Sequence, residues 1–170
     1  MFGAISGGGQ RSLTPQARKV GLSGAEDRLP HIGTEGCGVE EMQRADTPPA
    51  ILIVEDDFLI ASDVESTLKS AGFNVCGIAA SADEAVSLAK AHNPVLVIMD
   101  IRLAGKRDGI DAALELRRDL GLRCIFASAH ADEDTRRRAE LADPLGWMAK
   151  PYVMSGLIQL IKSSLILLRN

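Results

Sequence analysis

The segment VLVIMD, residues 95–100, sets the pattern for the chain, because five apolar residues end here in a single acid. Three other short apolar runs also end in polar residues: residues 51–54 are followed by EDD, residues 124–127 by a serine, and residues 147–149 by a lysine. Apolar runs of this length are typical of buried parallel strands. In a doubly wound sheet the carboxyl ends of such strands open onto one crevice. We therefore expect acids, a hydroxyl and a lysine to meet there, as a site for a divalent cation and a phosphoryl group.

Segments with a helical period lie between these apolar runs. The expected strands cover residues 51–55, 74–80, 95–99, 123–127 and 145–149. The expected helices cover 57–71, a segment that begins after Ser81, 109–120, 131–142 and 153–168. This alternation of strands and helices predicts an α/β fold with a parallel sheet and right-handed crossovers.

Local signals predict the faces and caps of these helices. The first helix has an apolar stripe that we expect to be buried: Ile60, Val64, Leu68 and Ala71. Ser81, with Glu84 three residues later, predicts an N-cap with a reciprocal acid.

The run of three arginines at 136–138 does not indicate a nucleic-acid-binding surface. Asp132, Glu133 and Asp134 each stand four residues before one of these arginines. This orientation favours i,i+4 ion pairs, worth about 0.2–0.5 kcal/mol each. Because the net charge is −4 and the chain has no basic field elsewhere, we expect no nucleic acid partner.

Composition predicts one core and a cytoplasmic location. A chain of 170 residues, 46% of them hydrophobic, is sufficient for one domain plus a tail. No apolar stretch approaches the ~20 residues of a membrane span, and the N-terminus lacks the apolar region of a secretory signal. Three scattered cysteines indicate neither a disulfide framework nor a zinc site. We expect no membrane partner.

Residues 1–47 differ in composition from the rest of the chain. They hold nine of the 16 glycines and show no sustained helical or strand period. We expect a disordered or marginally structured N-terminal extension over 1–47 and a folded domain over 48–170. Met42 is an alternative start, which leaves open whether residues 1–41 belong to the expressed protein.

Residues 50–168 resemble a response-regulator receiver domain, the phospho-accepting unit of two-component signalling. The resemblance rests on motifs that occur in order at the predicted strand ends: Glu55 and Asp56, Asp100, Ser128 with Ala129, Trp147, and Lys150 with Pro151. It implies a flavodoxin-like sheet of five parallel strands in the order 2-1-3-4-5, flanked by five helices.

The resemblance also implies a phosphoacceptor and a metal site. Asp100 would take the phosphoryl group. Asp56 and Asp100 would bind Mg²⁺ or Mn²⁺ directly, while Glu55 would act through water. The backbone carbonyl of Arg102 would supply a further oxygen. A cation would relieve the repulsion between the three carboxylates, roughly 3 kcal/mol per pair at ~5 Å and an effective dielectric of ~20, and oxygen ligands suit these two metals.

The remaining motif residues would bind the phosphoryl group and respond to it. By resemblance, Lys150, the Ser128 hydroxyl and the backbone N–H of Ala129 contact its oxygens. Ser128 and Trp147 would act together as the switch. The Lys150–Pro151 peptide bond would be cis.

The loop over residues 101–109 departs from most receivers. It has alanine at position 104, where most have proline, and it is one residue longer before its Asp-Gly. In this it is similar to receivers that are paired with HWE-type histidine kinases, which makes such a kinase a candidate donor.

We therefore predict a stand-alone response regulator without an effector domain. It would accept phosphate from a histidine kinase or phosphotransfer protein and catalyse only its own Mg²⁺-dependent phosphorylation and dephosphorylation. It would then act on a downstream protein target or drain phosphate from another pathway. Two alternatives stay open: a phosphorylation-independent adaptor, and a haloacid-dehalogenase-type phosphatase. The phosphatase would need an aspartate at the position of Arg102.

The last predicted helix, 153–168, is unusually apolar. One stripe would pack on the sheet, while Ile158 and Ile166 would face outward. We hypothesise homodimerisation through the surface made by residues 131–168.

Overall fold

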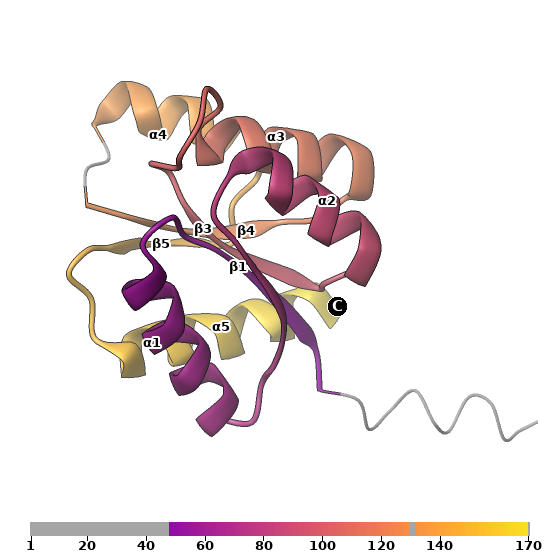
Figure 1. Ribbon diagram of the computed structural model, residues 1–170, viewed down its shortest axis with the longest axis vertical. Coiled ribbons are helices and arrows are strands. Elements are labelled where there is room, and N and C mark those ends of the chain that lie inside the picture. Colours follow the sequence, from indigo (N-terminus) through magenta and orange to yellow (C-terminus); the bar gives the residue numbers. More distant parts are fainter. Residues whose placement is uncertain (1–47, 130–131, 170) are drawn as a thin grey trace, which may run out of the picture. The chain divides into compact units, whose positions relative to one another are not determined.

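The computed structural model describes residues 48–129 and 132–169, which form five strands and five helices (Figure 1). The strands are β1 (Ala50–Val54), β2 (Asn74–Ala79), β3 (Leu96–Asp100), β4 (Cys124–Ser128) and β5 (Gly146–Ala149). The helices are α1 (Phe58–Ser70), α2 (Ala82–His92), α3 (Gly109–Leu120), α4 (Glu133–Glu140) and α5 (Met154–Arg169). The expectations for residues 1–47 lie outside the described residues.

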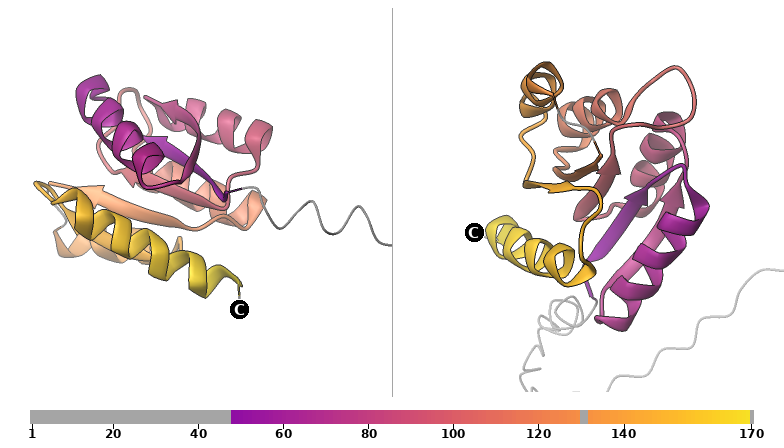
Figure 2. Two further views of the ribbon diagram at one scale, coloured as in Figure 1. Left: turned by 90° about the horizontal axis from the view of Figure 1, so that it is seen from below. Right: turned by 90° about the vertical axis from the view of Figure 1, so that its left-hand side faces the viewer.

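The strands are all parallel and lie in the order β2-β1-β3-β4-β5. Helices α2, α3 and α4 cover one face of the sheet, and α1 and α5 lie together on the other (Figures 1 and 2). This arrangement confirms the predicted doubly wound, flavodoxin-like fold. Because β1 and β3 are neighbours at the point where the strand order reverses, their carboxyl ends flank the position where such sheets bind ligands.

The central strands are buried on both faces. In β1, Ile51 and Ile53 pack in the cluster beneath α1 and α5, whereas Leu52 and Val54 pack in the cluster beneath α2 and α3. The other central strands alternate in the same way, and Phe126 on β4 is among the largest fully buried side chains. This two-sided burial explains the continuous apolar runs in the sequence.

The buried stripe of α1 differs from the prediction. Ala61, Val64 and Leu68 are buried, whereas Ile60 is 36% exposed and Ala71 is exposed. The helix begins at Phe58 after its N-cap Asp57, and Ala61 lies on the sheet-facing side. Ile60, one residue away, is rotated by about 100° and borders a surface groove beside β5 instead.

The reciprocal cap also lies elsewhere. Ser81 caps α2 by accepting from the Glu84 N–H (3.3 Å), but the Glu84 carboxylate accepts from the N–H of the residue before Ser81 (2.8 Å). A true capping box occurs at α3. There, Asp108 accepts from the Asp111 N–H (2.9 Å), and Asp111 accepts from the Asp108 N–H (3.2 Å).

Among the described residues, α4 forms only one of the three i,i+4 ion pairs that we expected. Glu133 and Arg137 lie 3.5 Å apart. Asp132 instead caps the helix by accepting from the backbone N–H three residues later (2.7 Å). Arg136 and Arg138 contact β5 and the start of α3. The prediction was wrong because it considered partners on the same helix alone.

In α5, the prediction for one of the two outward-facing isoleucines was wrong. Ile158 is partly buried and packs against the cluster around Leu157 and Ile161, because it lies next to that sheet-facing stripe. Ile166 is 63% exposed, as expected. Dimerisation through the 131–168 surface stays a prediction. None of the helices in the described ranges is long and apolar enough to cross a membrane.

Gly109 gives a test of how tightly the chain packs beside Asp100. A Cβ at this position would overlap the carbonyl group of Asp100, and the Gly109 N–H donates to the Ile101 carbonyl (2.8 Å). We expect Gly109→Ala to lower the free energy of unfolding by about 1–3 kcal/mol, as overpacking does. Urea unfolding measures this change.

The matched control is Gly156→Ala in α5, where an added Cβ would make only ordinary contacts at 3.5 Å or more. This change should be neutral or stabilising by up to about 1 kcal/mol, because alanine favours the helix. Equal effects of the two substitutions would contradict the close approach at Gly109.

Candidate functional site

The carboxyl ends of β1 and β3 bring three carboxylates together. Asp100 is the last residue of β3, and Glu55 and Asp56 directly follow β1. One oxygen from each carboxylate lies within 4.8 Å of the others. Glu55 and Asp100 are buried, whereas Asp56 is exposed. The cluster therefore has two fixed acids inside and one that faces solvent.

Lys150, just after β5, is the cation that contacts this cluster. Its Nζ lies 2.5 Å from Oε2 of Glu55 and 2.6 Å from Oδ2 of Asp100. Its side chain is 16% exposed, so these contacts are little screened by water. The backbone N–H of Lys150 donates to the Ser128 carbonyl (3.0 Å), and the Lys150–Pro151 bond is cis. One ammonium thus partly neutralises three acids.

Burial and neighbouring charges shift the pKa values of Glu55 and Lys150. Burial raises the pKa of Glu55 above its ordinary value, and the negative charge of Asp100 adds to this, while the hydrogen bond from Lys150 opposes it. Burial alone would lower the pKa of Lys150, but its hydrogen bonds to Asp100 and Glu55 outweigh that effect and raise it. Lys150 therefore stays a cation at neutral pH.

The donor set fits a hard divalent cation. All three side chains offer oxygen, which Mg²⁺ and Mn²⁺ prefer, and no thiol or imidazole belongs to the cluster. The exposed Asp56 leaves the site accessible to water, which Mg²⁺ retains in most protein sites. The backbone turns immediately after Asp100, where the Arg102 N–H donates to Asp100 Oδ1 (3.2 Å). Arg102 is thus held beside the cluster.

The other predicted site residues lie along the neighbouring strands. Ser128 ends β4, is buried, and pairs in register with Ala149, the residue before Lys150. Ala129 follows it and is exposed. Trp147 lies on β5, where its ring packs against Phe126 at a tilt of 31° with centroids 4.8 Å apart. The structure thus gathers Glu55, Asp56, Asp100 and Lys150, places Ser128 on the adjoining strand, and packs Trp147 against Phe126 on that strand.

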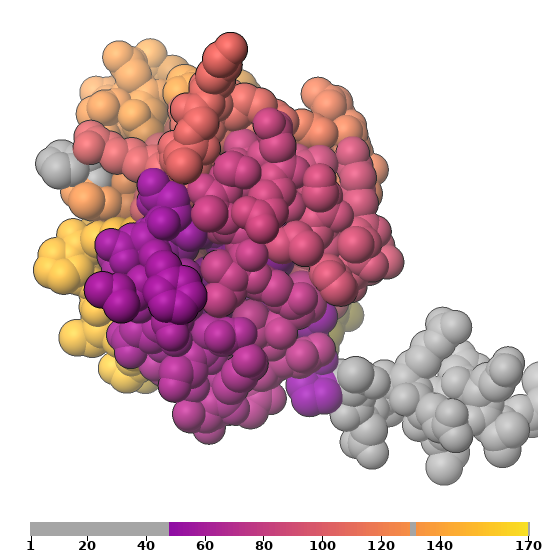
Figure 3. All heavy atoms as spheres, in the orientation of Figure 1, coloured from indigo at the N-terminus to yellow at the C-terminus, as the bar shows by residue number. Residues whose placement is uncertain are grey.

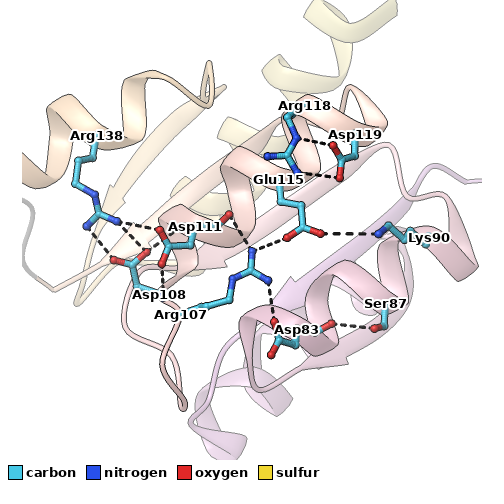
Figure 4. A network of polar contacts seen from close by, with 10 residues as sticks. All are labelled: Asp83, Ser87, Lys90, Arg107, Asp108, Asp111, Glu115, Arg118, Asp119 and Arg138. Carbon is cyan, nitrogen blue, oxygen red and sulfur yellow. Dashed lines mark hydrogen bonds and ion pairs between the residues drawn. The ribbon is translucent and has the colours of Figure 1, made fainter.

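Two features near the site were missed from the sequence. One is a groove of about 550 Å³ between α1 and the segment after β5, with Leu59, Ile60 and Lys150 among its lining residues. The other is a network of ion pairs at the loop after Asp100, in which Arg107 and Asp108 take part (Figure 4). The spacing of Asp108 and Asp111 could have predicted the capping box at the start of α3. The ion-pair partners of Arg107 and Asp108 on other helices could not be predicted from local sequence.

The chain matches known proteins over the same region. Residues 51–162 match the family model of the response regulator receiver domain. The transcriptional regulatory protein PdtaR of Mycobacterium tuberculosis is 37% identical over 118 residues, which cover 69% of this chain and 57% of the relative. The phyllosphere-induced regulator PhyR of Methylorubrum extorquens is 34% identical over 122 residues, which cover 71% and 45%. The chain thus spans about half the length of these curated relatives.

Solved structures agree with this match. The signal receiver domain of a modulated diguanylate cyclase from Desulfovibrio desulfuricans G20 superposes with a TM-score of 0.68 at 33% identity, covering 72% of this chain and 97% of that one. A CheX–CheY complex with BeF₃ and magnesium from Borrelia burgdorferi gives a TM-score of 0.65 at 27% identity, with 71% and 92% covered. Sheet order, matched residues and acidic cluster point the same way, and the chain belongs to the response regulator receiver domain family of two-component signalling.

Proposed function

We propose that this receiver accepts a phosphoryl group on Asp100 from a histidine kinase or phosphotransfer protein and then changes a protein-binding surface. The observation that carries the proposal is the Lys150 ammonium, 2.6 Å from Asp100 within a cluster of three carboxylates. A structural ion pair needs only one acid. An arrangement of three acids and one cation leaves net negative charge, which suits a further cation and a phosphoryl group.

The transfer itself needs little from the protein beyond position and charge. A carboxylate oxygen of Asp100 attacks phosphorus in line, and the P–N bond to the donor imidazole breaks with its electron pair moving to nitrogen. Asp56, Asp100, Glu55 through water, and the Arg102 carbonyl would hold Mg²⁺ or Mn²⁺. When bound, the metal supplies positive charge to the phosphoryl oxygens.

Lys150 has a second role in this proposal. In the structure its ammonium is shared between Glu55 and Asp100. Once the phosphoryl group is in place, its oxygens offer a stronger negative partner, worth about 1.5–2 charges, and Lys150 would shift toward it. The Ser128 hydroxyl and the Ala129 N–H would donate to the other oxygens. Trp147, three residues before Lys150, would then adjust its packing against Phe126.

The groove beside Lys150 is the surface on which we place the phosphodonor. Its walls are α1 and the segment after β5, which border each other at the surface in Figure 3. Leu59 lines it and is 76% exposed, as is the neighbouring Phe58. A helix of a histidine kinase or phosphotransfer protein seated on these apolar side chains would bring a phosphohistidine next to Lys150 and the acids.

Incubation with acetyl phosphate and Mg²⁺ tests the acceptor. We expect an intact-mass spectrum of the wild type to gain one phosphoryl group, stable to acid and labile to base, and Asp100→Asn to gain none. The control Asp57→Asn, which keeps an N-cap on α1, should behave as the wild type. An equal adduct on Asp100→Asn would contradict the assignment. No adduct on the wild type, even from a phosphorylated histidine kinase, would favour the adaptor.

Removing Lys150 tests its role as the internal counter-ion. Lys150→Met leaves the buried acids Glu55 and Asp100 without a cation. We expect the free energy of unfolding in EDTA to fall by about 2 kcal/mol, less than for a fully buried pair because Lys150 is 16% exposed. Saturating Mg²⁺ should restore much of this loss, since ligand at ~100 times its Kd stabilises by about 2.7 kcal/mol.

The matched control is Lys69→Met, which removes an exposed lysine paired with Glu65 at 2.8 Å. It should change stability by no more than about 0.5 kcal/mol, with no greater response to Mg²⁺ than the wild type. If Lys150→Met unfolds at the wild-type urea concentration in EDTA, Lys150 is not the counter-ion of this cluster.

A further inference from the structure

Helix α4 has almost no hydrophobic attachment to the rest of the domain. Its sequence is EDTRRRAE, Ala139 is its one buried residue, and Ala142, two residues after its end, is buried in the same cluster. Burying two alanine side chains contributes less than burying the leucines and isoleucines of the other helices. The position of α4 on the sheet must therefore depend largely on polar and aromatic contacts made by its arginines.

Arg138 provides the first of these contacts, to the loop and helix that follow Asp100. Its guanidinium lies 3.0 Å from Oδ2 and 3.4 Å from Oδ1 of Asp108, and 3.2 Å from Oδ1 of Asp111 (Figure 4). A guanidinium that engages two carboxylates is a directional contact, which fixes orientation as well as distance. Asp108 belongs to the capping box of α3, so Arg138 is tied to the N-terminus of that helix.

Arg136 provides the second contact, to β5. Its guanidinium carbon lies 5.2 Å from the centroid of the Trp147 ring, a cation–π distance. Trp147 stacks in turn on Phe126 of β4. The two arginines, two residues apart on α4, therefore contact two different elements, α3 and β5.

Asp108 is fixed relative to the candidate acceptor. The next residue, Gly109, packs against the Asp100 carbonyl with no room for a side chain, and its N–H donates to Ile101. Arg107, on the other side of Asp108, pairs with Asp83 on α2 at 2.8 Å and with Glu115 on α3 at 2.5 Å (Figure 4). The backbone at Asp108 therefore has close contacts on both sides, and two adjacent residues, Asp108 and Gly109, connect Arg138 to the backbone of Asp100.

We propose that Arg138 is a positioning residue that couples the seating of α4 on Trp147 to the occupancy of the site at Asp100. When the site at Asp100 becomes occupied, the Asp108–Arg138 contact changes the position of α4. The contact of Arg136 with Trp147 changes with it, which makes the movement measurable at the tryptophan. The proposal rests on the proposed function only for what occupies the site. The contact itself belongs to the fold and is measurable without any ligand.

The first arm of the test uses no ligand. We compare the wild type with Arg138→Gln, Asp108→Asn and the double variant by amide exchange of α4 and by acrylamide quenching of Trp147, the chain's one tryptophan. Asparagine keeps the cap of α3, so Asp108→Asn removes the charge and not the helix start. Each single variant should speed α4 exchange and raise quenching about two- to fivefold, the range expected for a half-exposed ion pair. The double variant should match Arg138→Gln, because the Asp108 contact is already lost when Arg138 is replaced. Asp108→Asn alone should have the smaller effect of the two singles, since Arg138 keeps its contact with Asp111.

The matched control is Arg137→Gln on the same helix. Arg137 is 70% exposed and pairs with Glu133 and Asp134 of its own helix, each at 3.5 Å. The Arg137→Gln substitution removes the same charge from α4 as Arg138→Gln. It should leave the amide exchange of α4 and the acrylamide quenching of Trp147 at wild-type values. If Arg138→Gln behaves like Arg137→Gln, or if the Asp108 and Arg138 effects add, the proposal is overturned.

The second arm adds Mg²⁺ with beryllofluoride, a phosphoryl mimic, and follows Trp147 emission. The wild type and Arg137→Gln should respond equally, and Arg138→Gln should lose at least about half of the response. Faster α4 exchange in Arg138→Gln with a full emission response would mean a merely structural contact and would overturn the coupling. Calorimetry separates the two claims: binding without any wild-type emission change overturns the coupling, whereas no binding overturns the proposed function and the coupling with it.

Discussion

Three carboxylates at one sheet edge repel one another, and the Lys150 ammonium is the charge that makes their approach tolerable. It contacts Glu55 and Asp100 at 2.5 and 2.6 Å, in surroundings where each side chain is at least four-fifths buried. At such distances and an effective dielectric of ~20, each attraction is on the order of several kcal/mol. One ammonium cannot balance three acids, however, and Asp56 faces solvent. The cluster therefore keeps a net negative charge, which is the property on which the proposed binding of a divalent cation and a phosphoryl group rests.

The parallel sheet fixes the relative positions of the four strand ends that carry the residues of the candidate site. Two-sided burial of β1, β3 and β4 leaves their backbones little freedom, so Glu55, Asp100 and Ser128 emerge at fixed points. The surrounding helices differ in how firmly they are attached. α1 and α5 pack by apolar stripes, whereas α4 depends on its arginines. Elements that move in conformational switches are drawn from the less stable parts of a fold, so α4 is the helix on which the proposed switch would act.

Sequence reasoning predicted the features that depend on burial and order. The apolar runs placed all five strands to within about one residue, and the polar residues after them identified the candidate site. It was wrong where a residue had a choice of partners in space. Ile60 borders a groove instead of the core, Ile158 packs where it was expected to be exposed, and Arg138 pairs with α3 instead of with its own helix. Helical periodicity gives the angle of a side chain around its own helix but does not identify the neighbouring elements. These contacts could therefore be found only from the tertiary structure.

A crystal structure of the protein with Mg²⁺ and beryllofluoride would test the proposed phosphoryl-accepting site most directly. We expect beryllium bonded to a carboxylate oxygen of Asp100, magnesium held by Asp56 and Asp100, and Lys150 Nζ moved from Glu55 toward a fluoride. Ser128 Oγ should donate to a second fluoride. Beryllofluoride on another residue, or Lys150 still shared between Glu55 and Asp100 with the mimic bound, would contradict the proposal that this cluster is a phosphoryl-accepting site.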